Sequence, residues 1–163
     1  DAEKVDIESD GHNTRIWTRD SEFTCKALEG KYPNYNSVIP RNNPYYITFD
    51  KMEMISVIKR VAMFSSESSN LIVLEKNGML LNVSAQDIDF GRSADDQVII
   101  TNAECNDHFR IGFKSSFLID TISAIDSDAI RMTLADPSRA GVVTAYEPSP
   151  STLTLLMPML IND

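Results

Sequence analysis

The fold is decided by residues 46–64, YITFDKMEMISVIKRVAMF, whose pattern returns in residues 110–128, RIGFKSSFLIDTISAIDSD. A shift of 64 positions places Phe49 on Phe113. In both copies a short extended run precedes apolar residues that recur every three or four positions, as on one face of a helix. An internal repeat of this kind predicts one structural unit used twice. The matched apolar positions are Met54, Ile55, Ile58 and Val61 in the first copy, and Leu118, Ile119, Ile122 and Ile125 in the second.

Strand signals come after each predicted helix. Asn77-Gly78 is a strong hairpin signal between two apolar runs. Each copy therefore reads β-α-β-β-β, and two copies predict an α+β domain with two helices on one face of a mainly antiparallel sheet. The strands are predicted over residues 71–74, 79–84, 97–101, 130–134, 142–146 and 152–159, with a polar loop over 87–96.

The helix starts carry capping residues. Asp50 stands where an N-cap belongs, and Glu53 comes three residues later, which is the capping-box spacing. Ser115 or Ser116 is predicted to cap the second helix.

The repeat is preceded by three short predicted strands within residues 3–29 and by the connector 30–40, GKYPNYNSVIP. Three short strands bury little core by themselves, so they resemble the end of a larger sheet. Proline fixes φ and keeps the preceding residue extended, so the connector is stiff, yet its tyrosines, Val38 and Ile39 are apolar and must pack. We therefore predict a boundary here, with residues 1–40 ending one domain and residues 41–163 forming the next.

Composition excludes several classes of protein. A net charge of −9 argues against a simple DNA-binding domain, which usually carries a basic excess, unless its few cations share one face. No apolar run approaches the ~20 residues of a membrane span, and no signal peptide opens the chain. The chain starts at Asp1 without an initiator Met, which predicts a fragment. Two cysteines suggest no disulfide framework, which favours a reduced cytosolic setting.

Enzymatic motifs are weak. The run Cys105-Asn106-Asp107-His108 offers a possible metal half-site or a Cys–His pair, but a zinc site needs three or four ligands. His12 is the only other histidine, and the sequence holds no G-x-S-x-G, P-loop or H-E-x-x-H motif. The acidic residues Asp87, Asp89, Asp95 and Asp96 lack the spacing of a calcium loop. We expect no catalytic residue, no metal and no cofactor.

Four motifs, in order and at suitable spacing, resemble the bacterial DNA polymerase III β subunit, or sliding clamp, family. The connector resembles that family's G-[KR]-[FY]-P-[DN]-Y pattern between its second and third domains. Ile111-Gly112-Phe113 resembles its I-G-F, Ile130-Arg131-Met132 with Leu134 resembles a third-domain strand, and Leu155–Met159 resembles the closing V-V-M-P-M. The resemblance covers residues 3–163 and implies the end of the second domain, then the whole third domain.

The resemblance implies a non-catalytic processivity factor. Such a protein encircles double-stranded DNA as a ring-shaped homodimer, without reading sequence, in the cytoplasm at the nucleoid. It would tether the polymerase III α subunit, the clamp loader, repair polymerases and mismatch-repair proteins through a hydrophobic groove. The groove residues implied here are Pro33, Ser37, Val38, Leu155, Met157, Pro158, Met159 and Leu160. Ser37 replaces an Arg common in relatives, and Leu160–Asp163 extends the usual chain end, so both alter the expected peptide preference.

Two further surfaces come from the resemblance. Lys51, Lys59 and Arg60 on the first helix would face DNA phosphates, and Met63 with Phe64 would contact the other subunit. Each assignment has a structural alternative: an inward strand face for Leu155, Met157 and Met159, a solvated helix face for the cations, and the domain's own core for Met63 and Phe64. A repeat-built interaction domain unrelated to replication is the alternative function.

One further segment has a misleading likeness. Ser9-Asp10-Gly11-His12 resembles a T-D-G-H segment of the clamp pocket, but it lies too close to the connector, so we predict only a hairpin turn at Gly11.

Overall fold

The computed structural model describes residues 4–32, 34–147 and 152–161, and the chain divides into two compact units. Unit 1 comprises residues 1–34 and unit 2 residues 35–163. Unit 1 holds an antiparallel sheet in the order β1 (Asp6–Ser9), β2 (Asn13–Trp17) and β3 (Glu22–Lys26). The three strands predicted for this region are confirmed. None of the described residues of unit 1 is buried, so this sheet has no core of its own.

The turn between β1 and β2 is built by Asp10 and Gly11. The Asp10 carboxylate accepts hydrogen bonds from the backbone N–H groups of His12, at 2.7 Å, and Asn13, at 2.5 Å. Gly11 has φ +86°, in the left-handed region that suits glycine. These bonds lower the pKa of Asp10, the one from Asn13 most. The hairpin turn predicted at Gly11 is confirmed.

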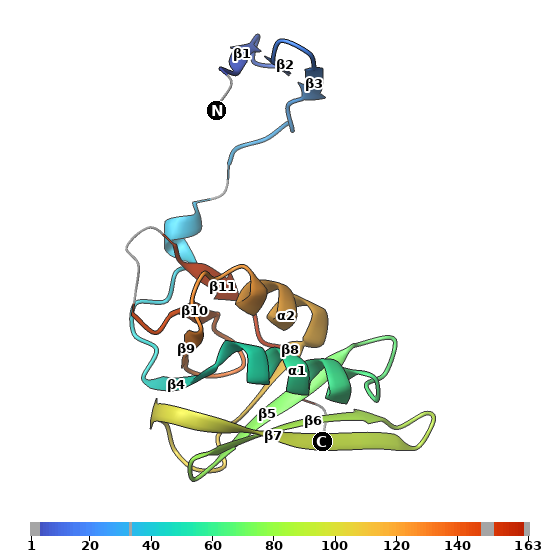
Figure 1. The fold of residues 1–163 in the computed structure, drawn as a ribbon, viewed down its shortest axis with the longest axis vertical. Helices are drawn as coiled ribbons and strands as arrows, with labels where there is room; N and C mark the ends of the chain where they lie inside the picture. The colour runs from blue at the N-terminus through green and yellow to red at the C-terminus, as the bar shows by residue number, and fades with distance from the viewer. Residues whose placement is uncertain (1–3, 33, 148–151, 162–163) are drawn as a thin grey trace. The chain divides into compact units, whose positions relative to one another are not determined.

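Unit 2 contains the predicted repeat (Figure 1). After the short 3₁₀ helix η1 (Tyr35–Ser37), each copy runs strand, helix and three strands. The first copy consists of β4 (Tyr45–Asp50), α1 (Lys51–Ala62), β5 (Leu71–Asn77), β6 (Leu80–Asp87) and β7 (Arg92–Glu104). The second copy consists of β8 (Arg110–Lys114), α2 (Ser115–Ser123), β9 (Ala129–Leu134), β10 (Gly141–Ala145) and β11 (Thr154–Leu156).

The two copies exchange strands. The sheet order is β11-β10-β9-β4-β7-β6-β5-β8, and all its pairs are antiparallel. The first strand of each copy pairs with the strand that comes after the helix of the other copy: β4 with β9, and β8 with β5. The helix starts show the same exchange, because Lys51 N donates to Asp128 O at 2.8 Å and Ser115 N donates to Asn70 O at 2.9 Å.

Both helices lie next to each other on one face of this sheet (Figure 1). Alternate strand residues point to the helices and are buried, whereas their neighbours point away. The predicted apolar helix positions are buried, apart from Ile119, which is partly buried. The core therefore has the composition that the repeat predicted, and the α+β arrangement is confirmed. Its largest fully buried side chains include Phe49, Phe113, Met54, Ile58, Leu118 and Ile122.

The capping prediction is right for the first helix and wrong for the second. Asp50 is the N-cap of α1, and its Oδ1 accepts from Glu53 N at 2.8 Å. In α2 the N-cap is Lys114, which makes no side-chain capping bond, and Ser115 is a buried first residue. Strand β8 runs directly into α2, so the bond from Ser115 N to Asn70 O replaces a side-chain cap.

The prediction of a polar loop over residues 87–96 is also wrong. Strand β6 extends to Asp87 and β7 begins at Arg92, with only a short turn between them. Asp87 is buried because its carboxylate accepts from Phe90 N, at 3.3 Å, and from the Arg92 guanidinium, at 2.8 Å. The polar residues at the start of β7 lie mostly at exposed positions, and its buried apolar residues, Val98 and Ile100, come only later in the strand.

The chain end differs from the prediction as well. Strand β11 covers three residues rather than the whole of 152–159. Beyond it, Met159 forms an isolated antiparallel bridge to Gly112 in β8, with Met159 N donating to Gly112 O at 2.8 Å. We call residues 157–161 the C-terminal strap. None of the helices in the described ranges has the length and apolar composition of a membrane span.

Candidate functional site

The C-terminal strap is held against β8 by a close backbone approach at Gly112. A Cβ built on Gly112 would lie 2.8 Å from Leu71 Cδ1, 3.0 Å from Met159 O and 3.2 Å from Ile161 Cγ1. A side chain there would force the Leu71 tip to move, because Cβ contacts below 3.0 Å are essentially never seen, and would push the strap outward by a few tenths of an ångström. Gly112 therefore fixes the path of the chain from Met157 to Ile161. The I-G-F motif owes its glycine to this contact.

Several of the predicted groove residues have exposed apolar side chains. Val38, Met157 and Leu160 are 59%, 61% and 76% exposed. Ser37 is exposed too, whereas Leu155, Pro158 and Met159 are partly buried. The alternative that Leu155, Met157 and Met159 simply form an inward strand face is not met, because the buried member of β11 is Leu156. Pro33 lies outside the described residues.

Two residues that the sequence motifs did not indicate join this region. Phe117, on the first turn of α2, is among the exposed large apolar residues, and the Lys114 amine lies 4.9 Å from the centroid of its ring. Both come soon after Gly112 in the chain, so they stand near the point where Met159 is bridged. Phe117 is a large apolar residue on the polar face of α2, beside Ser116 and Asp120, and this break in the pattern is the sequence signal that would have found it.

Helix η1 supplies the other predicted groove residues. Val38 N donates to Tyr35 O at 3.1 Å, which closes the turn that carries Ser37 and Val38. In the view of Figure 1, η1 and β11 are at the same end of unit 2.

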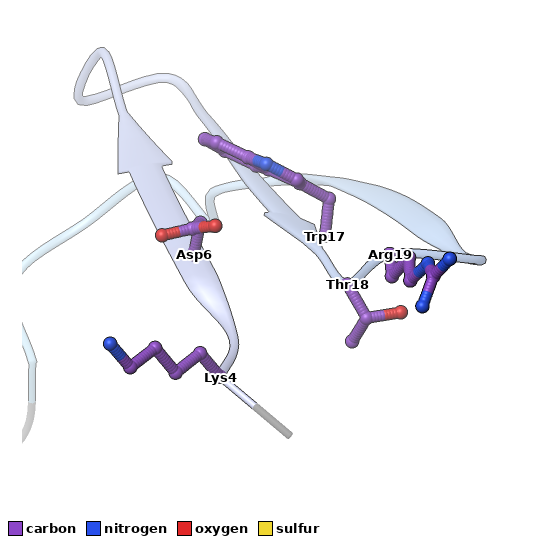
Figure 2. Close-up of a pocket in the computed structure, with 5 residues that line it drawn as sticks. All are labelled: Lys4, Asp6, Trp17, Thr18 and Arg19. Atoms are coloured by element: carbon purple, nitrogen blue, oxygen red, sulfur yellow. The ribbon is translucent and has the colours of Figure 1, made fainter.

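Two open hollows are found in unit 1. The first, of about 430 Å³, is lined by Lys4, Asp6, Trp17, Thr18 and Arg19 (Figure 2), and its three charged side chains make it unlike an apolar peptide site. The second is lined by Glu8, Ser9, Asp10, Asn13, Arg15 and Thr24.

The end of α1 carries the predicted subunit contact. Met63 is 69% and Phe64 38% exposed, so they do not enter the domain's own core. Met63 is the C-cap of α1, and Phe64 N donates to Val61 O at 3.0 Å. Two bulky apolar side chains held at a helix end in this way form an exposed patch.

The three predicted DNA-facing cations have different environments. The Lys51 amine donates to Ile125 O at 2.6 Å and to Ser123 O at 3.2 Å, at the C-terminal end of α2. The Arg60 guanidinium pairs with Asp96 at 2.6 Å and lowers the pKa of that carboxyl. Lys59 is exposed. Lys51 therefore stabilises the end of α2, where a cation complements the helix dipole, and two of its three ammonium N–H donors are used there.

The segment considered for metal or nucleophilic chemistry is structural. Asp107 accepts from the largely buried Lys76 amine, at 2.5 Å, and from Gly78 N, at 3.1 Å, so it closes the end of the β5–β6 hairpin. Burial raises the pKa of the Cys105 thiol, which disfavours the reactive thiolate. Within the ranges that the structure describes, no three His, Cys, Asp or Glu side chains are grouped to hold a metal ion.

A duplicated β-α-β-β-β domain with paired helices and a bridged C-terminal strap is the architecture of a sliding-clamp domain. Comparison with protein families agrees, since residues 36–160 match the model described as "DNA polymerase III beta subunit, C-terminal domain". The chain belongs to this family.

Curated relatives are beta sliding clamps. The protein from Pseudomonas aeruginosa is 26% identical over 148 residues, which cover 91% of this chain and 39% of the relative. The protein from Synechococcus elongatus is 27% identical over 165 residues, covering 99% of this chain and 42% of the relative. The chain thus spans about 40% of the length of the curated relatives it matches.

Solved structures agree. The P. aeruginosa DnaN sliding clamp bound to griselimycin superposes with a TM-score of 0.84 at 26% identity, over 96% of this chain and 42% of that one. The Bartonella birtlesii clamp bound to griselimycin gives a TM-score of 0.86 at 25% identity, over 96% of this chain and 41% of that one. The sliding-clamp fold predicted from the four motifs is confirmed.

Proposed function

We propose that this chain acts as the C-terminal part of a DNA polymerase processivity factor. The assembled protein encircles double-stranded DNA as a ring-shaped homodimer, in the cytoplasm, as a non-catalytic subunit of the DNA polymerase III holoenzyme. Residues 1–40 end its second domain and residues 41–163 form its third. The observation that carries this proposal is the family match over residues 36–160, together with the exposed apolar strap.

The groove is formed by Pro33, Ser37, Val38, Leu155, Met157, Pro158, Met159 and Leu160, extended by Lys114 and Phe117. It takes a peptide with apolar anchors from the polymerase α subunit, the clamp loader, repair polymerases or mismatch-repair proteins. Proline and the Gly112 bridge hold its walls, which reduces the entropy lost on binding. Methionine side chains adapt to different ligands, as a surface with several partners requires. Burying each Leu or Phe anchor contributes roughly 1.5–3 kcal/mol before association costs, which leads to about micromolar affinity.

The remaining two surfaces contact the other subunit and the DNA. Met63 and Phe64 contact the other subunit, because two exposed bulky apolar groups at a helix end need a partner to cover them. DNA is contacted weakly and without sequence preference through Lys51, Lys59 and Arg60. Lys51 also holds the end of α2, and Arg60 is paired with Asp96.

Fluorescence polarisation with a labelled Gln-Leu-x-Leu-Phe peptide tests the groove. The wild-type chain is expected to bind with about micromolar affinity, and Met157→Ala/Met159→Ala to lose at least about tenfold. Met79→Ala is the matched control, because Met79 is also largely exposed but lies in the β5–β6 turn. Equal binding by the double variant and the control would overturn the groove assignment. If no peptide binds, the measurement is repeated on a longer protein that carries unit 1 in its complete domain, and failure there has the same meaning.

A non-catalytic interaction domain unrelated to replication is the second candidate function. It requires no ring and no preference for the clamp motif. Sizing of the complete protein, with retention on circular but not linear DNA, separates the two, since only a closed ring depends on DNA topology.

A further inference from the structure

Arg131 has an environment that none of the functions above explains. Among the arginines that the structure describes, it alone is partly buried, and the others are exposed. Its side chain forms no ion pair or hydrogen bond with any described residue, although most of the exposed arginines do have a carboxylate partner. The opposite arrangement is usual in proteins, because an unpaired charge costs more free energy when it is buried than when it is exposed. The paired arginines are Arg15, Arg60, Arg92, Arg110 and Arg139.

Two tyrosine rings hold the Arg131 guanidinium in place. Arg131 is in β9, on the sheet face opposite the helices, because its neighbours Ile130 and Met132 are buried in the core. Its Cζ lies 4.7 Å from the ring centroid of Tyr46, in β4, and 5.1 Å from that of Tyr146, just after β10. A guanidinium stacked between aromatic faces is oriented before any ligand arrives, while the edge that carries its N–H groups is left unused.

Two polar atoms at this place lack hydrogen-bond partners. Arg131 Nε is buried without a partner, and so is the hydroxyl of Thr48, which stands directly opposite Arg131 in the β4–β9 register and is 1% exposed. The terminal Nη groups of Arg131 are not among the buried unpaired atoms of the described residues, so they remain open to solvent. Unpaired buried donors are rare in native proteins, which marks this position as incomplete.

Glu104, an acid on this face, does not complete it. Glu104 is opposite Tyr46 in the β4–β7 register and is exposed. No ion pair joins Glu104 to Arg131 in the described structure, so Glu104 does not occupy the N–H groups of the guanidinium. Tyr46 instead donates a hydrogen bond from its hydroxyl to Asn102 Oδ1 at 3.4 Å, which fixes one wall of the stack.

We propose that Arg131, stacked between Tyr46 and Tyr146, binds an oxyanion, a carboxylate or phosphate group, on the sheet face opposite the helices. The two oxygens of such a group accept in parallel from the guanidinium N–H groups, an arrangement that arginine forms better than lysine. Its residues come from β4, β9 and the position just after β10, and none of them is a groove residue or part of the exposed end of α1.

The test is an NMR titration of the 163-residue chain that monitors the Arg131 side-chain N–H signals. Inorganic phosphate, acetate and a short acetylated peptide with one Glu are added separately at constant ionic strength. Saturable shifts with at least one of them are expected, and Arg131→Gln is expected to weaken that binding at least about tenfold. Tighter binding of the peptide than of acetate identifies a polypeptide carboxylate as the source, and tighter binding of phosphate identifies a phosphate group.

Matched variants make the outcome decisive. Arg131→Lys keeps the charge but loses the planar fork, and it is expected to bind several-fold more weakly. Glu104→Gln removes the nearby negative charge and is expected to bind about twofold more tightly. If Arg131→Gln does not fold, Tyr146→Leu replaces it: Tyr146 is 39% exposed, and its loss removes one of the two rings that orient the guanidinium, so weaker binding is again expected. Shifts that rise linearly without saturation for all three probes, or that are the same in wild type and variant, would overturn the proposal.

Discussion

Substituting Gly112 by alanine should separate the position of the C-terminal strap from the rest of the fold. The new Cβ would meet Leu71 Cδ1 at 2.8 Å and Met159 O at 3.0 Å. The leucine tip can rotate away, but the carbonyl belongs to the strap backbone, whose own N–H is bonded to Gly112 O. Relief therefore requires the strap to move outward by a few tenths of an ångström.

The cost has two contributions. Overpacking a tight site costs about 1–3 kcal/mol, and weakening one backbone hydrogen bond costs about 1 kcal/mol. We expect Gly112→Ala to lower the free energy of unfolding by about 2–4 kcal/mol, and Tm by about 4–16 °C for a protein of this size. Because the strap also carries Met157 and Leu160, affinity for the clamp-motif peptide should fall about tenfold.

Gly78→Ala is the matched control for this substitution. Gly78 has φ +58° in an exposed hairpin, with nothing within 4 Å of a built Cβ, so it loses about 1 kcal/mol through backbone strain alone. Thermal unfolding by circular dichroism and peptide polarisation are measured on both variants. A loss of stability at Gly112 no larger than at Gly78 would refute the tight approach. A clear loss of stability with unchanged peptide affinity would refute the strap as a groove wall.

Three further predictions concern charge and the exposed end of α1. Lys51→Met should lower the free energy of unfolding by about 1–2 kcal/mol, because two carbonyls at the end of α2 lose their donor. The exposed control Lys59→Met should change it by less than about 0.5 kcal/mol. Both values are measured by chemical denaturation, and equal effects would contradict the capping role of Lys51. The Lys76 amine, and next the Gly78 N–H, hold the pKa of Asp107 below its ordinary value of 3.8, so the stability from this pair is complete above that pH and is lost as pH falls through the lower, folded-state pKa. Asp107→Asn should therefore flatten the dependence of Tm on pH between about pH 5 and pH 2, and an unchanged slope would argue against the bond. The double variant Met63→Glu/Phe64→Glu should leave the Tm of this chain almost unchanged, since both side chains are exposed. In a complete clamp the same variant should shift the dimer toward monomer in analytical sedimentation. If the dimer is unaffected, these two residues are not part of the subunit interface.

The repeat, and the features that depend on local chemistry, can be read from the amino-acid sequence alone. Apolar spacing placed both helices, because only one helical face can be buried against a sheet. Asp50 was identifiable as an N-cap since its contact, Glu53 N, is three residues away. The strand-helix-strand-strand-strand order and the family motifs came from the same short-range patterns.

Features that join residues distant in the chain could be established only from the folded protein. Strand β7 begins earlier than its apolar residues indicate. Its polar first half pairs with β6, and this pairing provides the backbone hydrogen bonds regardless of which side chains are exposed. Ser115 needs no side-chain cap because Asn70 O, 45 positions earlier, accepts its N–H. Lys51 holds the end of α2 because folding places Ile125 O 2.6 Å from its amine, although the two residues are 74 positions apart. The environment of Arg131 arises in the same way, from three strands whose pairing no local pattern encodes.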